Sequence, residues 1–213
     1  MSRITETVKH LLIINCIFFL ATSLYGNKLY DLFALHYFDN SLFQIWQPIT
    51  HMFLHGNFSH ILFNMIGLWM FGSPIEQIWG RNKFIFFYIS SGLGAAVLQM
   101  LYSYYDFNSI FEILINNGFN SEEILNTIKT RRYNTNWLSY ISENQLNHLN
   151  ESFNLSMVGA SGALYGILVA FAFLFPNISL FLLFIPIPIK AKYFVPILIA
   201  GDLFFGVSNS FSI

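Results

Sequence analysis

The chain has 213 residues, of which 55% are hydrophobic, 19% aromatic and only 10% charged. Soluble domains carry about 25% charged residues. The charges here are clustered, so apolar windows of about 20 residues, enough to span a bilayer, remain between them. The net charge of −1 gives no indication of nucleic-acid binding. The single Cys16 excludes a disulfide within these residues. We therefore expect an all-α, multi-pass membrane protein embedded in a lipid bilayer.

The first apolar run, residues 11–24, follows Arg3 and Lys9. This pattern also occurs in signal peptides, but the rest of the chain is equally apolar, so we expect an uncleaved first span. Residues 26–47 are aromatic and amphipathic and too polar to span a bilayer. They predict an interfacial loop with short helices, anchored by tryptophan and tyrosine at headgroup depth.

A second span is predicted at residues 58–78. His60 and Asn64 lie in its first turns and, four residues apart, on one face. Glu76 lies near its far end, before a short basic turn at residues 80–83. A third span at 84–102 carries small residues that favour close helix packing, namely Ser90, Ser91, Gly92 and Gly94.

Residues 104–154 are polar and rich in Asn and Ser, which predicts an extramembrane insertion between the third and fourth spans. Helices are expected to begin near Ser121 and Ser142, because each precedes acidic residues and an apolar run. We interpret the insertion as a structured surface loop without chemistry of its own. The alternative is a part in handling substrate.

A fourth span is predicted at residues 155–175. It opens with small residues, including the G-x-x-x-G pair Gly162 and Gly166, and with one hydroxyl, Ser161. Such a serine usually bonds its own helix or a neighbouring one. Residues 178–189 are interrupted by two prolines and predict a re-entrant or interfacial segment. A fifth span at 193–207 contains Asp202, for which we expect structural pairing with a neighbouring helix.

The distribution of Lys and Arg in the short loops predicts a cytoplasmic N-terminus. In that orientation the second and fourth spans both begin at the outer face. His60, Asn64 and Ser161 then lie at the same depth. Helix starts carry unpaired N–H groups and a positive dipole end. A hydroxyl there, beside Asn and His donors, has the parts of a nucleophile and an oxyanion hole.

Two motifs give this arrangement a family resemblance. They are Gly159-Ala160-Ser161-Gly162 and the pattern His55-x4-His60-x3-Asn64. In this order and spacing they resemble the rhomboid intramembrane serine proteases. Trp46, Glu76-x3-Gly80 and Gly201-Asp202-Leu203-Phe204 resemble the family as well. The resemblance implies a single rhomboid-like domain over residues 1–213, a bundle of six transmembrane helices of which five lie in this sequence, and a multi-pass location in a bacterial cell membrane.

The resemblance also implies a mechanism and a set of roles. Ser161 would be the nucleophile of a Ser–His dyad, and His60 and Asn64 would stabilise the oxyanion. Gly159 would allow close approach, Tyr165 would pack against the base, and His55 would make structural hydrogen bonds. Glu76 would tie the far end of the second span to its neighbours. Substrates would be transmembrane proteins cleaved near the outer face, with no cofactor and no metal.

Two departures from the family pattern are visible. Gln47 follows Trp46 where the family usually has arginine, which is expected to loosen the interfacial loop. The family base is a histidine in a sixth span, and no histidine follows His148. We expect the sequence to be a C-terminally incomplete copy of an active enzyme. The alternative is a pseudoprotease that binds membrane proteins without cutting them, because an unactivated serine is a poor nucleophile.

A metal site is the remaining alternative. His51, His55 and His60 are close in sequence, but no Glu lies between His51 and His55, so the H-E-x-x-H pattern is absent. Gly56 and Asn57 predict that the helix begins after His55, which would separate these side chains. We therefore expect no metal.

Overall fold

The computed structural model describes residues 3–182 and 185–211, apart from the side chains of 181, 182, 185–187, 203 and 205–211. The described residues are mostly helical. The first helix, α1 (Glu6–Tyr25), is predominantly apolar and 20 residues long, as predicted for a first span. The side chain of the N-cap residue Thr5 accepts no hydrogen bond from the first N–H groups of α1. These groups are bonded instead by Glu76, whose carboxylate accepts bonds from the N–H groups of Thr7 (3.0 Å) and Val8 (3.1 Å) and from the Thr5 hydroxyl.

The Glu76 contacts satisfy N–H groups that every helix start leaves unpaired, and they place a negative charge at the positive end of α1. The predicted tie between Glu76 and a neighbouring element is thereby confirmed, with the start of α1 as the partner.

The interfacial loop folds as predicted into short elements: α2 (Asn27–Phe33), β1 (Leu35–His36), α3 (Gln47–Thr50) and η1 (His51–Phe53). The last carbonyls of α2 are covered by side chains from the other end of the loop. The Trp46 indole donates to the carbonyl of Leu32 (3.0 Å), and the Thr50 hydroxyl donates to that of Phe33 (2.8 Å).

The expectation that Gln47 loosens this loop is wrong. Gln47 is fully buried. Its amide nitrogen donates to the carbonyl of Leu42 (2.8 Å) and reaches that of Asp31 (3.3 Å), while its oxygen accepts the N–H of His36 (3.2 Å). A neutral amide both donates and accepts, so one side chain satisfies backbone groups on both sides of the loop.

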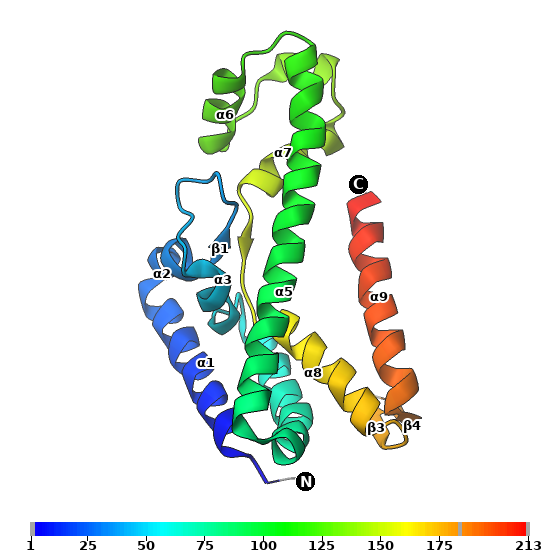
Figure 1. Ribbon diagram of the computed structural model, residues 1–213. Coiled ribbons are helices and arrows are strands. Elements are labelled where there is room, and N and C mark those ends of the chain that lie inside the picture. Colours follow the sequence, from blue (N-terminus) through cyan, green and yellow to red (C-terminus); the bar gives the residue numbers. More distant parts are fainter. Residues whose placement is uncertain (1–2, 183–184, 212–213) are drawn as a thin grey trace.

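The second span is a continuous helical run through α4 (Phe58–Gly67), the π-helical stretch η2 (Leu68–Gly72) and the first residues of α5 (Ser73–Asn116). Gly80 then reverses the chain with φ 75° and ψ 165°. These angles favour glycine, and the remainder of α5 returns alongside the run (Figure 1). The helix that contains the predicted third span does not end near residue 102 but continues to Asn116.

The C-terminal part of α5 carries a hydrophobic core, formed with α6 (Ser121–Lys129), η3 (Thr135–Ser139) and α7 (Glu143–Phe153). Asn120, one residue before the predicted position, caps α6, and Ser142 forms a capping box with Gln145. Tyr37 of the interfacial loop is buried in the same core against Phe107 and Phe153. The insertion is therefore a packed layer that contacts the loop.

The fourth helix is shorter than predicted. Residues 155–160 are not helical: β2 (Ser156–Met157) pairs antiparallel with β1, and α8 spans Ser161–Leu174. The two glycines of its G-x-x-x-G pair lie against α5. A methyl group on Gly162 would lie 2.5 Å from the Ala95 Cβ, and one on Gly166 would lie 2.3 Å from the Ser91 Oγ. The predicted close packing of small residues is confirmed, because no side chain fits at either contact.

The chain then forms a hairpin of β3 (Ser179–Leu182) and β4 (Ile185–Lys190), followed by α9 (Ala191–Phe211). The segment predicted as re-entrant or interfacial is thus a β-hairpin at one end of the molecule (Figure 1). Among the described residues, Glu6–Tyr25 and the reversed run Phe58–Asn116 have the length and apolarity of membrane spans, and Ser161–Leu174 is apolar but shorter.

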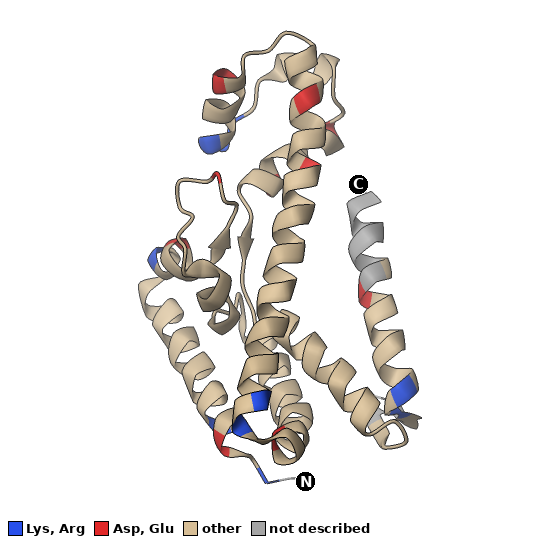
Figure 2. Cartoon of the chain, in the orientation of Figure 1, with Lys and Arg blue, Asp and Glu red and all other residues tan. Residues whose placement is uncertain are grey.

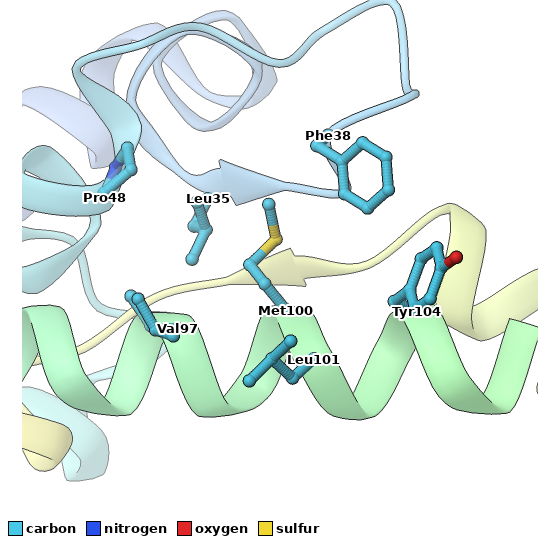
Figure 3. A pocket seen from close by; sticks show the side chains of 8 residues that line it. Leu35, Phe38, Pro48, Val97, Met100, Leu101 and Tyr104 are labelled. Carbon is cyan, nitrogen blue, oxygen red and sulfur yellow. The ribbon is translucent and has the colours of Figure 1, made fainter.

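An apolar pocket of about 460 Å³ separates the interfacial loop from α5 (Figure 3). The predicted catalytic residues are absent from its lining, which consists of Leu35, Phe38, Pro48, Ala96, Val97, Met100, Leu101 and Tyr104.

Candidate active site

Ser161 is the first residue of α8 and is half-buried. The helix has no side-chain cap at this end, since its N-cap is Ala160. The first N–H groups of a helix have no partner within it. The hydroxyl of Ser161 therefore lies at the positive end of α8, next to backbone donors that the helix itself does not use.

Gly159 joins the strand to this helix and can only be glycine. Its φ of +121° is a conformation that other residues rarely adopt. A methyl group on its Cα would lie 2.7 Å from the Nε2 atom of His60 and 3.6 Å from the Oγ atom of Ser161. The imidazole and the hydroxyl therefore flank the same point of the chain.

The backbone of Gly159 is held by His51. The Gly159 N–H donates to the carbonyl of His51 (2.9 Å), and the Nδ1 atom of His51 lies 3.0 Å from the carbonyl of Gln47. Burial lowers the pKa of His51. From the sequence, His51 was considered only as a metal ligand. This contact could not be predicted, because a backbone carbonyl leaves no signal in the residue type.

His60 and Asn64 come from the start of α4, one turn apart. Asn57 caps this helix by accepting the N–H of His60 (2.8 Å), as predicted from Gly56 and Asn57. Asn64 is 6% exposed, and its Nδ2 atom has no hydrogen-bond partner among the described residues. A buried amide donor without a partner costs about 1–3 kcal/mol, so this group is available to a ligand that brings an acceptor.

The starts of α4 and α8 lie in one layer. His60 contacts Gly159 at one level, and a methyl group on Gly67 would lie 2.9 Å from the Leu164 side chain at the next. These two contacts bracket Asn64 on one helix and Ser161 on the other. The helices therefore run in the same direction from a common level, as predicted.

His55, which precedes α4, is fully buried beside this layer. Its carbonyl accepts the Tyr30 hydroxyl (2.7 Å), and its ring packs edge-on against that of His60, with 5.0 Å between centroids. Burial, together with the nearby His60, lowers the pKa of His55 to about 4, against a smaller opposing effect of the Phe53 backbone. Both ring nitrogens lack a well-formed hydrogen bond to any described residue. His55 is thus held by the hydrogen bond to its backbone carbonyl and by the edge-on packing of its ring against His60.

Tyr165 lies one turn beyond Ser161 on α8, and its hydroxyl donates to the Asp202 carboxylate of α9. This bond confirms the expected pairing of Asp202 with a neighbouring helix. The adjacent Leu203 side chain lies outside the described residues.

A further polar cluster lies in the insertion, away from Ser161. Asp106 of α5 accepts the Ser152 hydroxyl of α7, and one of its oxygens lies 3.2 Å from the Nδ1 atom of His148. The serine bonds the carboxylate directly and not the imidazole. The cluster therefore joins α7 to α5 and lacks the serine–histidine bond of a catalytic triad.

Comparison with known proteins identifies the family. The model of the Rhomboid domain matches residues 42–213, which is most of the chain, and the chain therefore belongs to the rhomboid family of intramembrane serine proteases. It is an integral membrane protein of that family. The insertion and the interfacial loop from Leu42 onward lie within the matched range.

Two relatives illustrate the similarity. The chain is 32% identical over 98 residues to the Rhomboid protease GlpG of Salmonella choleraesuis (strain SC-B67), which covers 45% of this chain and 36% of that relative. It is 33% identical over 86 residues to the Rhomboid protease GlpG of Salmonella newport (strain SL254), which covers 40% and 31%. The chain thus spans about a third of the length of these curated relatives.

Proposed function

We propose that the protein is an intramembrane serine endopeptidase that cleaves membrane-spanning proteins near the outer face. Ser161 is its nucleophile, and His60 and Asn64 are its oxyanion donors. The observation that carries the proposal is the common layer of these three residues, with Ser161 at a helix start and the Asn64 amide buried without a partner.

The proposed chemistry is acyl transfer. The Ser161 oxygen adds to the scissile carbonyl carbon and loses its proton to a base. The carbonyl oxygen becomes an oxyanion, which accepts bonds from the Ser161 N–H and from the side chains of His60 and Asn64. Collapse of this intermediate expels the amine, which takes the proton from the base. Water then hydrolyses the ester by the same steps in reverse order.

A base is required for the first step. In the dyad that the rhomboid resemblance implies, the base is a histidine. Among the described residues no histidine is hydrogen-bonded to Ser161, and we assign His60 to the oxyanion. We therefore assign the base to none of the six histidines in this sequence.

The proposed membrane arrangement has five spans and a cytoplasmic N-terminus. The first span is α1, the second and third are the two arms of the run Phe58–Asn116, and the fourth and fifth are α8 and α9. In this orientation Ser161, His60 and Asn64 face the outer side, together with the insertion and the interfacial loop. The substrate is a transmembrane protein whose helix unwinds at that depth.

A serine-reactive fluorophosphonate tests the nucleophile directly. We expect the full-length gene product in native membranes to be labelled at Ser161 with loss of fluoride, and the Ser161→Ala variant to remain unlabelled. Ser156→Ala is a matched control, because Ser156 is exposed on β2, only five residues away. Labelling that persists in Ser161→Ala would refute the assignment. An unlabelled wild-type protein that still binds single-span peptides would instead be a pseudoprotease.

A further inference from the structure

The cationic side chains of this protein gather at one end. Figures 1 and 2 show the start of α1, the reversal at Gly80, the β3–β4 hairpin and the start of α9 at this end. These elements carry six of the ten lysines and arginines, against two of the eleven carboxylates, Glu6 and Glu76. The six are Arg3, Lys9, Arg81, Lys83, Lys190 and Lys192.

Three of these cations surround one hollow. Arg3 and Lys9 of the α1 start and Arg81 of the Gly80 reversal line a hollow of about 460 Å³, together with Glu6 and Glu76. All three cations are exposed. Within the described part of the chain the only ion pair joins His148 to Asp106, so none of the three is paired with either carboxylate.

The Glu76 carboxylate is already hydrogen-bonded to the start of α1. It accepts bonds from the Thr5 hydroxyl and the N–H groups of Thr7 and Val8. Its charge therefore stabilises the start of α1, and the same bonds hold Arg3 and Lys9 next to the reversal that carries Arg81. Glu6 is the other carboxylate that lines the hollow. The three cations therefore exceed the negative charge available to them there.

The surroundings of the hollow are apolar along the helix. Ile4 lines it and is 43% exposed. Ile13 and Ile17, one and two turns beyond Lys9, form an exposed apolar face of α1, at 49% and 58%. In a membrane protein this places the hollow at headgroup depth, beside lipid chains. Lysine and arginine near that surface attract anionic lipids, and a guanidinium binds phosphate with two parallel bonds.

We propose that this hollow binds the phosphate of an anionic phospholipid headgroup, with the acyl chains lying along the exposed face of α1. Free phosphate offers the same charge, but it makes no use of the adjoining apolar face. The proposal is independent of the protease assignment, because it uses neither Ser161 nor its neighbours.

Native mass spectrometry of the detergent-solubilised full-length protein tests the proposal by titration with phosphatidylglycerol or phosphatidylcholine. We expect tighter binding of phosphatidylglycerol, weakened about 100-fold in R3Q/K9Q/R81Q, since each cation contributes roughly fivefold. The control K129Q/R131Q/R132Q removes the same charge from the insertion and should bind like the wild type. The three hollow-lining cations make no side-chain hydrogen bond to a described residue, so the variant is expected to fold.

Several outcomes would overturn the proposal. They are equal binding of the two lipids, equal loss in the control variant, and undiminished phosphatidylglycerol binding by R3Q/K9Q/R81Q. Inorganic phosphate that displaces the lipid at equal concentration would assign the hollow to free phosphate instead. The single variant R81E, checked for an unchanged melting temperature, should weaken phosphatidylglycerol binding by tenfold or more. Undiminished binding by R81E would contradict the assignment in the same way.

Discussion

The imidazole of His60 lies directly against the α-carbon of Gly159: a methyl group at that carbon would be 2.7 Å from the Nε2 atom. This contact joins the start of α4 to the residue that precedes the α8 helix by two positions. The backbone φ of Gly159, +121°, independently restricts this position to glycine. The relative position of His60 and Ser161 therefore requires that residue 159 has no side chain.

Gly159→Ala is accordingly expected to disturb both stability and activity. The left-handed backbone costs about 1–3 kcal/mol for a non-glycine residue. Displacing His60 by about 1 Å should reduce cleavage about 100-fold. Thermal unfolding and cleavage of a single-span reporter measure the two effects. Gly94→Ala is the matched control, because no atom lies within 4 Å of the added methyl group, and it should retain wild-type activity.

Asn64→Ala should separate catalysis from stability. Losing one oxyanion donor costs about 10²–10³ in kcat. The Asn64 amide nitrogen has no partner among the described residues, so little stability should be lost with it. His60→Ala should show a similar fall in kcat, with KM nearly unchanged. The exposed Asn82 provides the control Asn82→Ala. If the fall in kcat in Asn64→Ala were accompanied by a clear fall in melting temperature, Asn64 would have a structural role instead.

The bond between Tyr165 and Asp202 predicts coupled effects on stability. Tyr165→Phe and Asp202→Asn should each cost about 1 kcal/mol, and the double variant should cost little more than either single one. Cleavage should stay within tenfold of the wild type, because the pair joins α8 to α9 and is not assigned to the reacting atoms. Loss of turnover in Asp202→Asn at an unchanged melting temperature would contradict this interpretation.

The buried His55 predicts a loss of stability in acid. Its pKa is lowered from 6.5 to about 4 in the folded protein. As pH falls, the unfolded chain therefore takes up the proton first. The contribution of neutral His55 is fully present above about pH 6.5 and is lost down to about pH 4, for a total of about 3 kcal/mol. Denaturant titrations between pH 7 and 4 should show this slope, reduced in His55→Leu. An unchanged slope would show that His55 is not its source.

Much of the helical framework was predictable from local signals. The lengths of apolar runs indicated α1 and the run through α4, and Ser142 with Gln145 indicated the start of α7. The small residues Gly162 and Gly166 indicated a close helix contact, although not that Ser91 and Ala95 would provide the other side. These features depend on residues a turn or two apart, which is the range that periodicity and capping describe.

The features that were missed depend on long-range contacts. The third span was expected to end near residue 102 because its polarity rises there, but α5 continues to Asn116 because Phe107, Ile110 and Leu114 pack into the core of the insertion. The pairing of β1 with β2 shortened the fourth helix. Gln47 was predicted to loosen a loop that it holds together, because its backbone partners leave no mark on the sequence.

Cleavage of a purified single-span reporter by the full-length gene product in proteoliposomes tests the role of Ser161. We expect cleavage near the outer end of the reporter span by the wild-type protein and by Ser156→Ala. We expect no cleavage by Ser161→Ala, with an unchanged melting temperature. Cleavage of the reporter by Ser161→Ala at the wild-type rate would show that Ser161 is not the nucleophile.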